Sequence, residues 1–240
     1  MVLPFPAKVR PRGWSFPLSS TAERSPLRPG EPAPDFVLPA GDGDGVVALG
    51  NYRGKTPVLL AMMRGLYCAF CRRHIAQLGS ARQKLIAVGV ETVAIVGMRP
   101  ERLRLYYQYH PVGVPIAADP DLITHQAYGV PQPPLTPEVL QAVASRHVEL
   151  ARKLEIAAID QVEIKRVLAE RDGFEPVAAE LVDRRDWSDR YGGQLTGQFL
   201  VDRTGVIRWV NIEGAREGLA GLERFPSDDE LLEAARTLTG

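Results

Sequence analysis

Between residues 34 and 130, short apolar runs alternate with segments of helical periodicity. The run at 57–63 is apolar throughout, which is typical of a strand buried on both faces, and a second apolar run lies at 92–96. Between them, residues 68–88 carry apolar side chains at helical spacing. Other elements expected here are strands at 36–38 and 46–49 around a glycine-rich turn, a helix at 100–110 and a short helix after Pro120. This alternation predicts an α/β domain.

The last part of the chain returns to the same pattern. Two apolar runs, at 198–202 and 206–210, flank a turn that contains Gly205 and predict a β-hairpin. Ser227 is followed three residues later by Glu230, which is the spacing of a capping box, so a final helix is expected to begin there.

Residues 130–192 break the alternation. A proline-rich linker is followed by Thr136 and Pro137, residue types preferred at the N-cap and the first position of a helix. Helical spacing then continues from 139 to about 171 without a strong breaker, so we expect a helical insertion over about 132–191. We expect its apolar face to pack on its own domain; covering the cysteines and forming a dimer contact are the alternatives. That face comprises Val143, Leu150, Leu154, Ile159 and Val162.

The first 34 residues contain eight prolines and few residues that could form a core. We therefore divide the chain into a proline-rich amino-terminal arm, residues 1–30, and one domain, residues 31–240, which contains the insertion. The arm is expected to lie extended on this domain or to be mobile in solution; the alternative is that it reaches a second subunit, as it would in a homodimer.

The composition and charge argue against some classes of binding partner. The chain has 240 residues, of which 45% are hydrophobic, and its 29 basic residues balance 29 acidic ones. It therefore lacks the long-range attraction of a protein that binds nucleic acid or an acidic membrane. No run of 18 apolar residues is present, so no segment is expected to span a bilayer. The first residues lack the order of a secretory signal and there is no framework of paired cysteines, so we expect a cytoplasmic protein.

The two cysteines, Cys68 and Cys71, are the strongest chemical signal in the sequence. They lie where the buried strand at 57–63 meets the following helix. A helix N-terminus favours a thiolate, and Arg64 and Arg72 add positive potential, so we expect a lowered thiol pKa. Three residues are close to one helical turn, which allows the two sulfurs to form a disulfide. This arrangement predicts reversible dithiol chemistry.

Two other interpretations of the pair are a zinc half-site and two inert buried thiols. A zinc site needs further ligands, but the four histidines show no ligand spacing, and His74, three residues after Cys71, is expected to be exposed. The glycine-rich turn at 41–45 leads into a strand rather than a helix, and no nucleophile elbow is present. The sequence therefore implies no nucleotide, flavin or metal cofactor.

The order of several motifs resembles that of a known family. These motifs are Ala33-Pro34-Asp35-Phe36, Asn51-Tyr52-Arg53-Gly54-Lys55, Arg64-Gly65-Leu66-Tyr67-Cys68-Ala69-Phe70-Cys71, Asp119-Pro120, Ala127-Tyr128-Gly129-Val130 and Phe199-Leu200-Val201-Asp202-Arg203-Thr204-Gly205. Over residues 31–130 and 194–214 the chain resembles the peroxiredoxin-like branch of the thioredoxin-fold superfamily, the alkyl hydroperoxide reductase / thiol-specific antioxidant group. The resemblance implies a thioredoxin-like fold, in which helices flank a central mixed sheet, with the cysteines at the carboxyl end of the strand 57–63.

The resemblance leaves the attacking cysteine open. Thioredoxins carry Trp-Cys-x-x-Cys, which aligns Tyr67 with the tryptophan and makes Cys68 the attacking thiol. Peroxiredoxins carry Pro-x-x-x-Thr-x-x-Cys, and the same frame then places the attacking thiol at Cys71, with Arg64 at the proline. The arginine that peroxiredoxins place before the late strand is Thr196 here, and Arg64 could substitute for it as the cation.

Three functions are compatible with these residues. The first is a peroxiredoxin-like peroxidase with an antioxidant role, which reduces hydroperoxides through a Cys68–Cys71 disulfide and is reset by an external dithiol such as thioredoxin. The second is a thiol–disulfide oxidoreductase that acts on protein or small-molecule disulfides. The third is a non-enzymatic redox-sensing module whose insertion contacts a partner.

Overall fold

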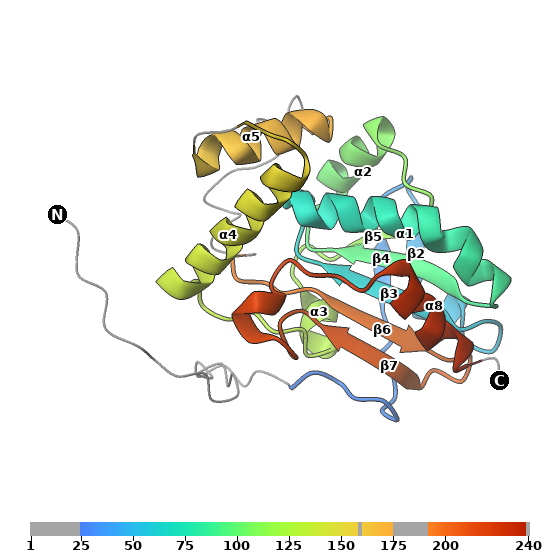
Figure 1. Ribbon diagram of the computed structural model, residues 1–240. Coiled ribbons are helices and arrows are strands. Elements are labelled where there is room, and N and C mark those ends of the chain that lie inside the picture. The colour runs from blue at the N-terminus through green and yellow to red at the C-terminus, as the bar shows by residue number, and fades with distance from the viewer. Residues whose placement is uncertain (1–24, 158–159, 175–191, 239–240) are drawn as a thin grey trace.

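The core of the protein is a five-stranded mixed sheet, seen in a computed structural model that describes residues 25–157, 160–174 and 192–238 (Figure 1). The strand order is β5-β4-β3-β6-β7. Its strands are β3 (Val58–Met63), β4 (Glu91–Val96), β5 (Ile116–Ala118), β6 (Gly197–Val201) and β7 (Ile207–Ile212). Strand β3 pairs parallel with β4 and antiparallel with β6, so the expected mixed sheet is confirmed.

Strand β3 is the middle strand of the sheet, and it also lies between the two layers that cover the faces of the sheet. All six of its residues are buried, because both faces of the sheet are covered, and this explains its unbroken apolar run. The hairpin β6–β7 and the strand at β4 are likewise confirmed. Strand β5, which pairs parallel with β4, was not expected. Its three residues are too few to show a periodic pattern of their own.

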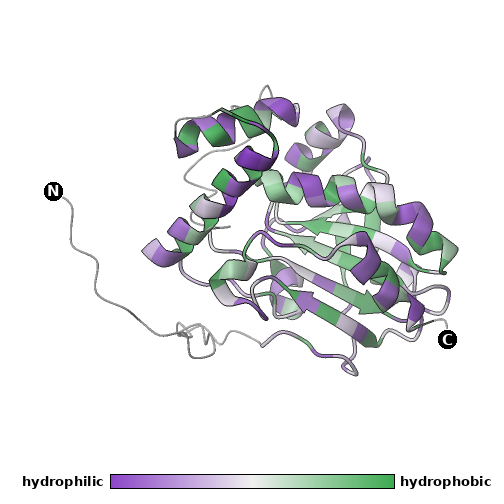
Figure 2. Cartoon of the chain, in the orientation of Figure 1, coloured by the Kyte–Doolittle hydropathy of each residue, from purple (hydrophilic) through white to green (hydrophobic). Residues whose placement is uncertain are grey.

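Helices cover one face of this sheet. They are α1 (Ala69–Ala87), α2 (Pro100–Tyr109) and α8 (Asp228–Arg236). Their apolar faces join Leu59, Ala61 and Met63 of β3 in the larger hydrophobic cluster. Figure 2 shows the same division, with hydrophobic residues in the sheet and hydrophilic ones on the outer faces of the helices. Helix α8 begins at the expected capping box of Ser227 and Glu230.

The other face of the sheet is covered by shorter elements. They are the hairpin of β1 (Val37–Pro39) and β2 (Val46–Ala48), the 3₁₀ turn η1 (Leu49–Asn51) and the short helix α3 (Ile123–Ala127). With Tyr128 and Val130 they surround Val58, Leu60 and Met62 of β3 in a second cluster. Residues on alternate sides of one strand therefore serve two separate cores.

The end of the arm that the structure describes lies along this domain. The backbone N–H of Leu27 donates to the carbonyl of Tyr128 at 3.2 Å, and that of Gly30 donates to Ile207 at 2.8 Å. Pro32 forms an isolated bridge with Val206. Residues 1–24, the greater part of the arm, lie outside the described residues.

The expected insertion contains two helices, α4 (Pro137–Lys153) and α5 (Gln161–Arg171), rather than one continuous helix. The predicted start is confirmed, because the Thr136 side chain accepts from Val139 N. The helical spacing that the sequence shows from 139 to about 171 is therefore interrupted between these two helices. Glu155 adopts a left-handed φ of 54°, and Asp160 caps a new helix by accepting from two backbone N–H groups.

Helices α4 and α5 lie at the amino-terminal end of α1 (Figure 1). Ala69, in the first turn of α1, forms a cluster with Ala151, Ile164 and Leu168, against which Leu150 and Leu154 pack. Part of the predicted apolar face is wrong, since Val162 is 76% exposed. Ile159 lies outside the described residues. Among the described helices, none is both long and apolar enough to cross a membrane.

Candidate active site

The site lies at one edge of the sheet, where three strand ends meet. Met62 of β3 pairs with Gly197 of β6, and Gly197 pairs with Ile212 of β7. The residues just beyond these pairs therefore converge: Arg64 follows β3, Thr196 precedes β6 and Glu213 follows β7. Because β6 runs antiparallel to β3, its first residues lie beside the end of β3.

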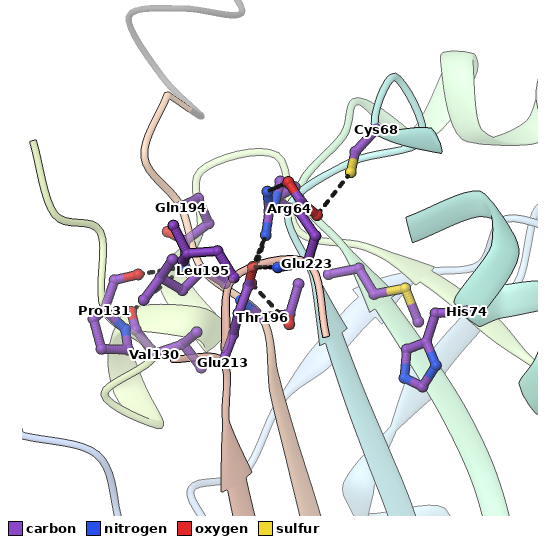
Figure 3. Close-up of polar contacts among 12 residues, drawn as sticks. Arg64, Cys68, His74, Val130, Pro131, Gln194, Leu195, Thr196, Glu213 and Glu223 are labelled. Atoms are coloured by element: carbon purple, nitrogen blue, oxygen red, sulfur yellow. Dashed lines mark hydrogen bonds and ion pairs between the residues drawn. The ribbon is translucent and has the colours of Figure 1, made fainter. Parts of the chain in front are cut away.

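Arg64 is the central residue of this edge (Figure 3). Its Nη2 lies 2.6 Å from Glu213 Oε1, and its Nη1 lies 2.6 Å from Glu223 Oε1. The Arg64 side chain is 11% exposed, and those of Glu213 and Glu223 are 0% and 1% exposed. Burial by itself would lower the pKa of Arg64, but the two carboxylates raise it well above its usual range. The fork of the guanidinium thus holds two carboxyl groups in place.

Thr196 belongs to the same network through Glu213. Its backbone N–H and its hydroxyl donate to Glu213 Oε2 at 2.9 and 3.1 Å. The backbone N–H of Glu223 donates to Glu213 Oε1 at 2.7 Å. Thr196 therefore orients the carboxylate that orients Arg64, and the structure brings these two predicted residues together.

Cys68 is the N-cap residue of α1, and Cys71 is in the first turn of that helix. Both are free thiols; Cys68 is 8% exposed and Cys71 is fully buried. The Cys68 Sγ lies 3.5 Å from Glu223 Oε2, and Figure 3 shows Glu223 between Cys68 and Arg64. A carboxyl group, rather than a guanidinium, is thus in contact with the more exposed sulfur.

The thiol pKa shifts in the direction opposite to our expectation. The pKa of Cys68 is raised well above its usual range, first by a side-chain hydrogen bond with Cys71 and then by burial. Arg64 and a backbone hydrogen bond at Cys71 lower it, but by less. The expected lowering is therefore wrong at Cys68, because the hydrogen bond with Cys71 and burial outweigh the positive charge of Arg64.

Tyr67 shapes the turn between β3 and α1. Its hydroxyl donates to the carbonyl of Arg64 at 3.2 Å. Gly65 has a φ of 153°, and a Cβ there would lie 2.2 Å from the Tyr67 ring. The glycine of Arg-Gly-x-x-Cys is therefore needed to let the Tyr67 ring fold back over the turn.

Arg72 joins this turn to the insertion. Its Nη1 donates to the carbonyls of Leu66 and Tyr67 at 3.0 and 3.2 Å. Its Nη2 lies 2.8 Å from Asp172, and its guanidinium lies 4.5 Å from the centre of the Phe174 ring. Arg72 therefore holds the turn in place, and it shares the carboxylate of Asp172 with Arg73.

His74 is buried, and the expectation that it is exposed is wrong. Its ring stacks on Phe225 with centroids 4.3 Å apart, and its two nitrogens contact Gln77 and Gln198. Burial lowers the pKa of His74 to about 4, so the ring is neutral at neutral pH. In the part of the chain that the structure describes, no group of His, Cys, Asp or Glu is arranged to hold a metal ion.

Three carboxylates of the site were not predicted from the sequence: Glu213, Glu223 and Asp172. The chain has 29 acidic residues, and a buried one carries no local mark that separates it from a solvated one. Glu213 does have a weak signal, because it follows an apolar strand directly. Asp172 lies in a polar segment and Glu223 in an irregular one, and neither had such a signal.

The fold and the site together are a thioredoxin-like sheet with two free thiols at the start of the helix that follows its central strand. Residues 29–210 match the model of the AhpC/TSA family. The chain belongs to this family and is a thiol-dependent oxidoreductase of peroxiredoxin-like type, as its resemblance implied.

Its relatives carry two kinds of name. The thiol-disulfide oxidoreductase ResA of Halalkalibacterium halodurans is 30% identical over 125 residues, which are 52% of this chain and 69% of ResA. A Mycobacterium tuberculosis protein that bears a provisional peroxiredoxin name is 29% identical over 103 residues, which are 43% of this chain and 64% of that one.

Solved structures share the fold. A reduced 2-Cys peroxiredoxin of Plasmodium vivax is 18% identical, with a TM-score of 0.54 over 88% of this chain and 81% of that one. The peroxidoxin BcpB of Mycobacterium tuberculosis is 11% identical, with a TM-score of 0.56 over 89% and 99%. The thioredoxin-like fold that the sequence implied is confirmed.

Proposed function

We propose that this protein reduces hydroperoxides, with Cys68 as the attacking thiol and Cys71 as the resolving one. The observation that carries the assignment of roles is the difference in exposure: Cys68 is 8% exposed at the end of α1, whereas Cys71 is fully buried. A substrate must reach the sulfur that it oxidises, while a resolving thiol needs only to reach its partner. Family membership supports the reaction class.

The cycle has three balanced steps. The Cys68 thiol gives up its proton and the thiolate attacks one peroxide oxygen. The O–O bond breaks, Cys68 becomes a sulfenic acid, and the departing alkoxide takes up that proton and leaves as an alcohol. The Cys71 thiol then attacks the Cys68 sulfur, forming the disulfide and releasing water. An external dithiol reduces this disulfide through a mixed disulfide and leaves with its own thiols oxidised.

Rapid mixing of the reduced protein with an alkyl hydroperoxide tests this function. We expect Cys68→Ser to lose the fast step, and Cys71→Ser to keep it but stop at a sulfenic acid that a dimedone-type reagent traps. Loss of the fast step in Cys71→Ser alone would reverse the roles. Peroxide consumption that is unchanged when both cysteines become serine would refute the function.

A second candidate is reduction of protein or small-molecule disulfides. Two observations favour it: the 30% identity to ResA, and the absence of an arginine at position 196, where peroxiredoxins bind peroxide. Comparing second-order rate constants for a hydroperoxide and a model disulfide decides between the two. A Cys68→Ser variant that reduces the disulfide at the parent rate would exclude this candidate.

We further infer a reductant, a compartment and an assembly. A dithiol protein such as thioredoxin suits the cycle, since its exposed thiolate can attack the Cys68–Cys71 disulfide. The cytoplasm is the compartment we propose, because the sequence has no cysteines beyond this pair. A homodimer stays a prediction, which sedimentation tests. The division into an arm (residues 1–30) and a domain (31–240) with an insertion (132–191) also stays a prediction, which limited proteolysis tests.

A further inference from the structure

The buried cluster beside Cys68 holds more negative than positive charge. Glu213 and Glu223 share the single guanidinium of Arg64, so the three groups sum to −1 when all are ionised. An uncompensated charge in a buried site is costly, so a carboxylate there binds a proton more readily than an exposed one. One of the two carboxylates is therefore suited to bind a proton.

Hydrogen bonding singles out Glu223 as that carboxylate. Glu213 accepts from four sources: Arg64, the N–H and hydroxyl of Thr196, and the N–H of Glu223. Both oxygens of Glu213 are therefore occupied by donors other than the Cys68 thiol. Glu223 accepts from Arg64 at Oε1 and from the Cys68 thiol at Oε2. Burial and the charges of Cys68 and Glu213 raise the pKa of Glu223 well above its usual range, although Arg64 opposes the shift.

The backbone at Glu223 supports a functional role. Its φ of 60° is left-handed, and only two other non-glycine residues in the described part of the chain, Leu122 and Glu155, have positive φ. A side chain with a Cβ is strained in this region and is retained where its position matters. Here the conformation lets the N–H of Glu223 reach Glu213 while its carboxyl reaches Cys68.

Charged and titratable groups surround Glu223 from every element packed against it. They are Arg64 after β3, Glu213 after β7, Cys68 and Cys71 at the start of α1, and Arg146 of α4, whose Nε donates to the neighbouring carbonyl of Leu222 at 3.0 Å. The next residue, Arg224, is exposed and pairs with Glu217. Of these groups, only the Cys68 thiol donates to the Glu223 carboxyl and must also lose its proton for the reaction to begin.

We propose that Glu223 carries the proton of the Cys68 reaction: its Oε2 takes the proton from the Cys68 thiol and returns it to the leaving group. This inference rests on the proposed function, because it concerns the same attacking thiol. With a hydroperoxide, the thiolate forms an S–O bond, the O–O bond breaks, and Glu223 protonates the departing alkoxide. With a disulfide, an S–S bond forms and another breaks, and Glu223 protonates the departing thiolate. Atoms and charge balance in both cases.

The test compares leaving groups that do and do not need the proton. Glu223→Gln keeps the shape and an oxygen for Arg64 but cannot carry a proton. It is measured in a Cys71→Ser background, so that only Cys68 reacts, against an alkyl hydroperoxide, a dialkyl disulfide and an aromatic disulfide. The alkoxide and the alkyl thiolate are basic leaving groups, whereas an aromatic thiolate leaves without protonation. Glu217→Gln removes an exposed carboxylate from the same segment and is the matched control.

We expect Glu223→Gln to slow the hydroperoxide reaction about a hundredfold at neutral pH, the usual scale of general acid–base catalysis. The dialkyl disulfide reaction should slow to a similar extent. The aromatic disulfide reaction, which needs Glu223 only to take the thiol proton and not to protonate the leaving group, should slow markedly less, and Glu217→Gln should leave all three rates unchanged. An equal loss with every reagent, or no loss with any, would overturn the proposal.

Two further readouts keep the inference testable on its own. If the parent does not react with hydroperoxides, the proposed peroxidase function fails, but the ratio of dialkyl to aromatic disulfide rates still tests Glu223. If Glu223→Gln does not fold, the solvent deuterium isotope effect is measured on the parent chain. We expect it to be larger for the dialkyl than for the aromatic disulfide, and equal effects would contradict proton carriage by Glu223.

Discussion

Arg64 and Arg72 flank the cysteine pair and are both paired with carboxylates, but their partners come from different parts of the molecule. Arg64 binds Glu213 and Glu223, both from the carboxyl-terminal part of the thioredoxin-like domain. Arg72 binds Asp172, which follows α5 in the insertion. The first cluster is part of the core, at the edge of the sheet, whereas the second joins the core to an added segment.

Because of this difference, we expect the first cluster to affect the stability of the domain and the second to affect how the insertion packs on it. The Arg64 cluster forms when the sheet forms, because the ends of β3, β6 and β7 bring most of it together. The Arg72 cluster needs α4 and α5 to pack on the first turn of α1. Breaking the first is therefore expected to destabilise the whole domain, and breaking the second to loosen the packing of the insertion on the first turn of α1.

The largest effect is expected for Arg64→Met. Removing the guanidinium leaves two buried carboxylates without their cation, which costs about 3–5 kcal/mol of unfolding free energy. Denaturant titration followed by circular dichroism measures it. A loss below about 1 kcal/mol would show that the cluster does not stabilise the core.

A second, pH-dependent effect comes from His74, on the core side of the comparison. Its pKa is lowered to about 4 by burial, against 6.5 for an unperturbed histidine, so the folded state binds fewer protons than the unfolded one. Its contribution to stability is therefore complete above pH 6.5 and lost as the pH falls towards 4, about 3 kcal/mol in all. The measurement is the difference in unfolding free energy between the parent and His74→Gln from pH 7 to pH 4.5. A constant difference would refute it.

The smallest effect is expected on the insertion side. Asp172→Asn removes the charge that faces Arg72 and Arg73, but Arg72 keeps its two carbonyl acceptors and the Phe174 ring. We expect a loss of about 1–2 kcal/mol in unfolding free energy. Relative to the parent chain, amide hydrogen exchange should accelerate more in α4 and α5 than in β3.

Val162→Ser is the surface control for this measurement, since Val162 is 76% exposed, and it should change stability by less than about 0.5 kcal/mol. Equal acceleration of exchange in α4, α5 and β3 after Asp172→Asn would mean that the insertion does not open separately.

Much of the core could be predicted from local patterns. Three features were each predicted from a few neighbouring residues and each is confirmed: the apolar strand β3, the capping box at Ser227 and the cap at Thr136. Strand β5 was too short to read, and the break at Glu155 lies in a segment whose spacing stayed helical. Such breaks depend on tertiary packing, which overrides weak local preferences.

The sequence by itself determined the chemistry: two cysteines three residues apart, at the junction of a buried strand and a helix, in a family frame. Only the tertiary structure decided which groups surround them. Glu213 and Glu223 lie 149 and 159 residues from Arg64 along the chain, and the site forms only when strand pairing and chain reversal bring them to one edge. Burial then determines what each group does, because the pKa of a carboxyl or a thiol depends on the solvent and charges that folding removes or brings near.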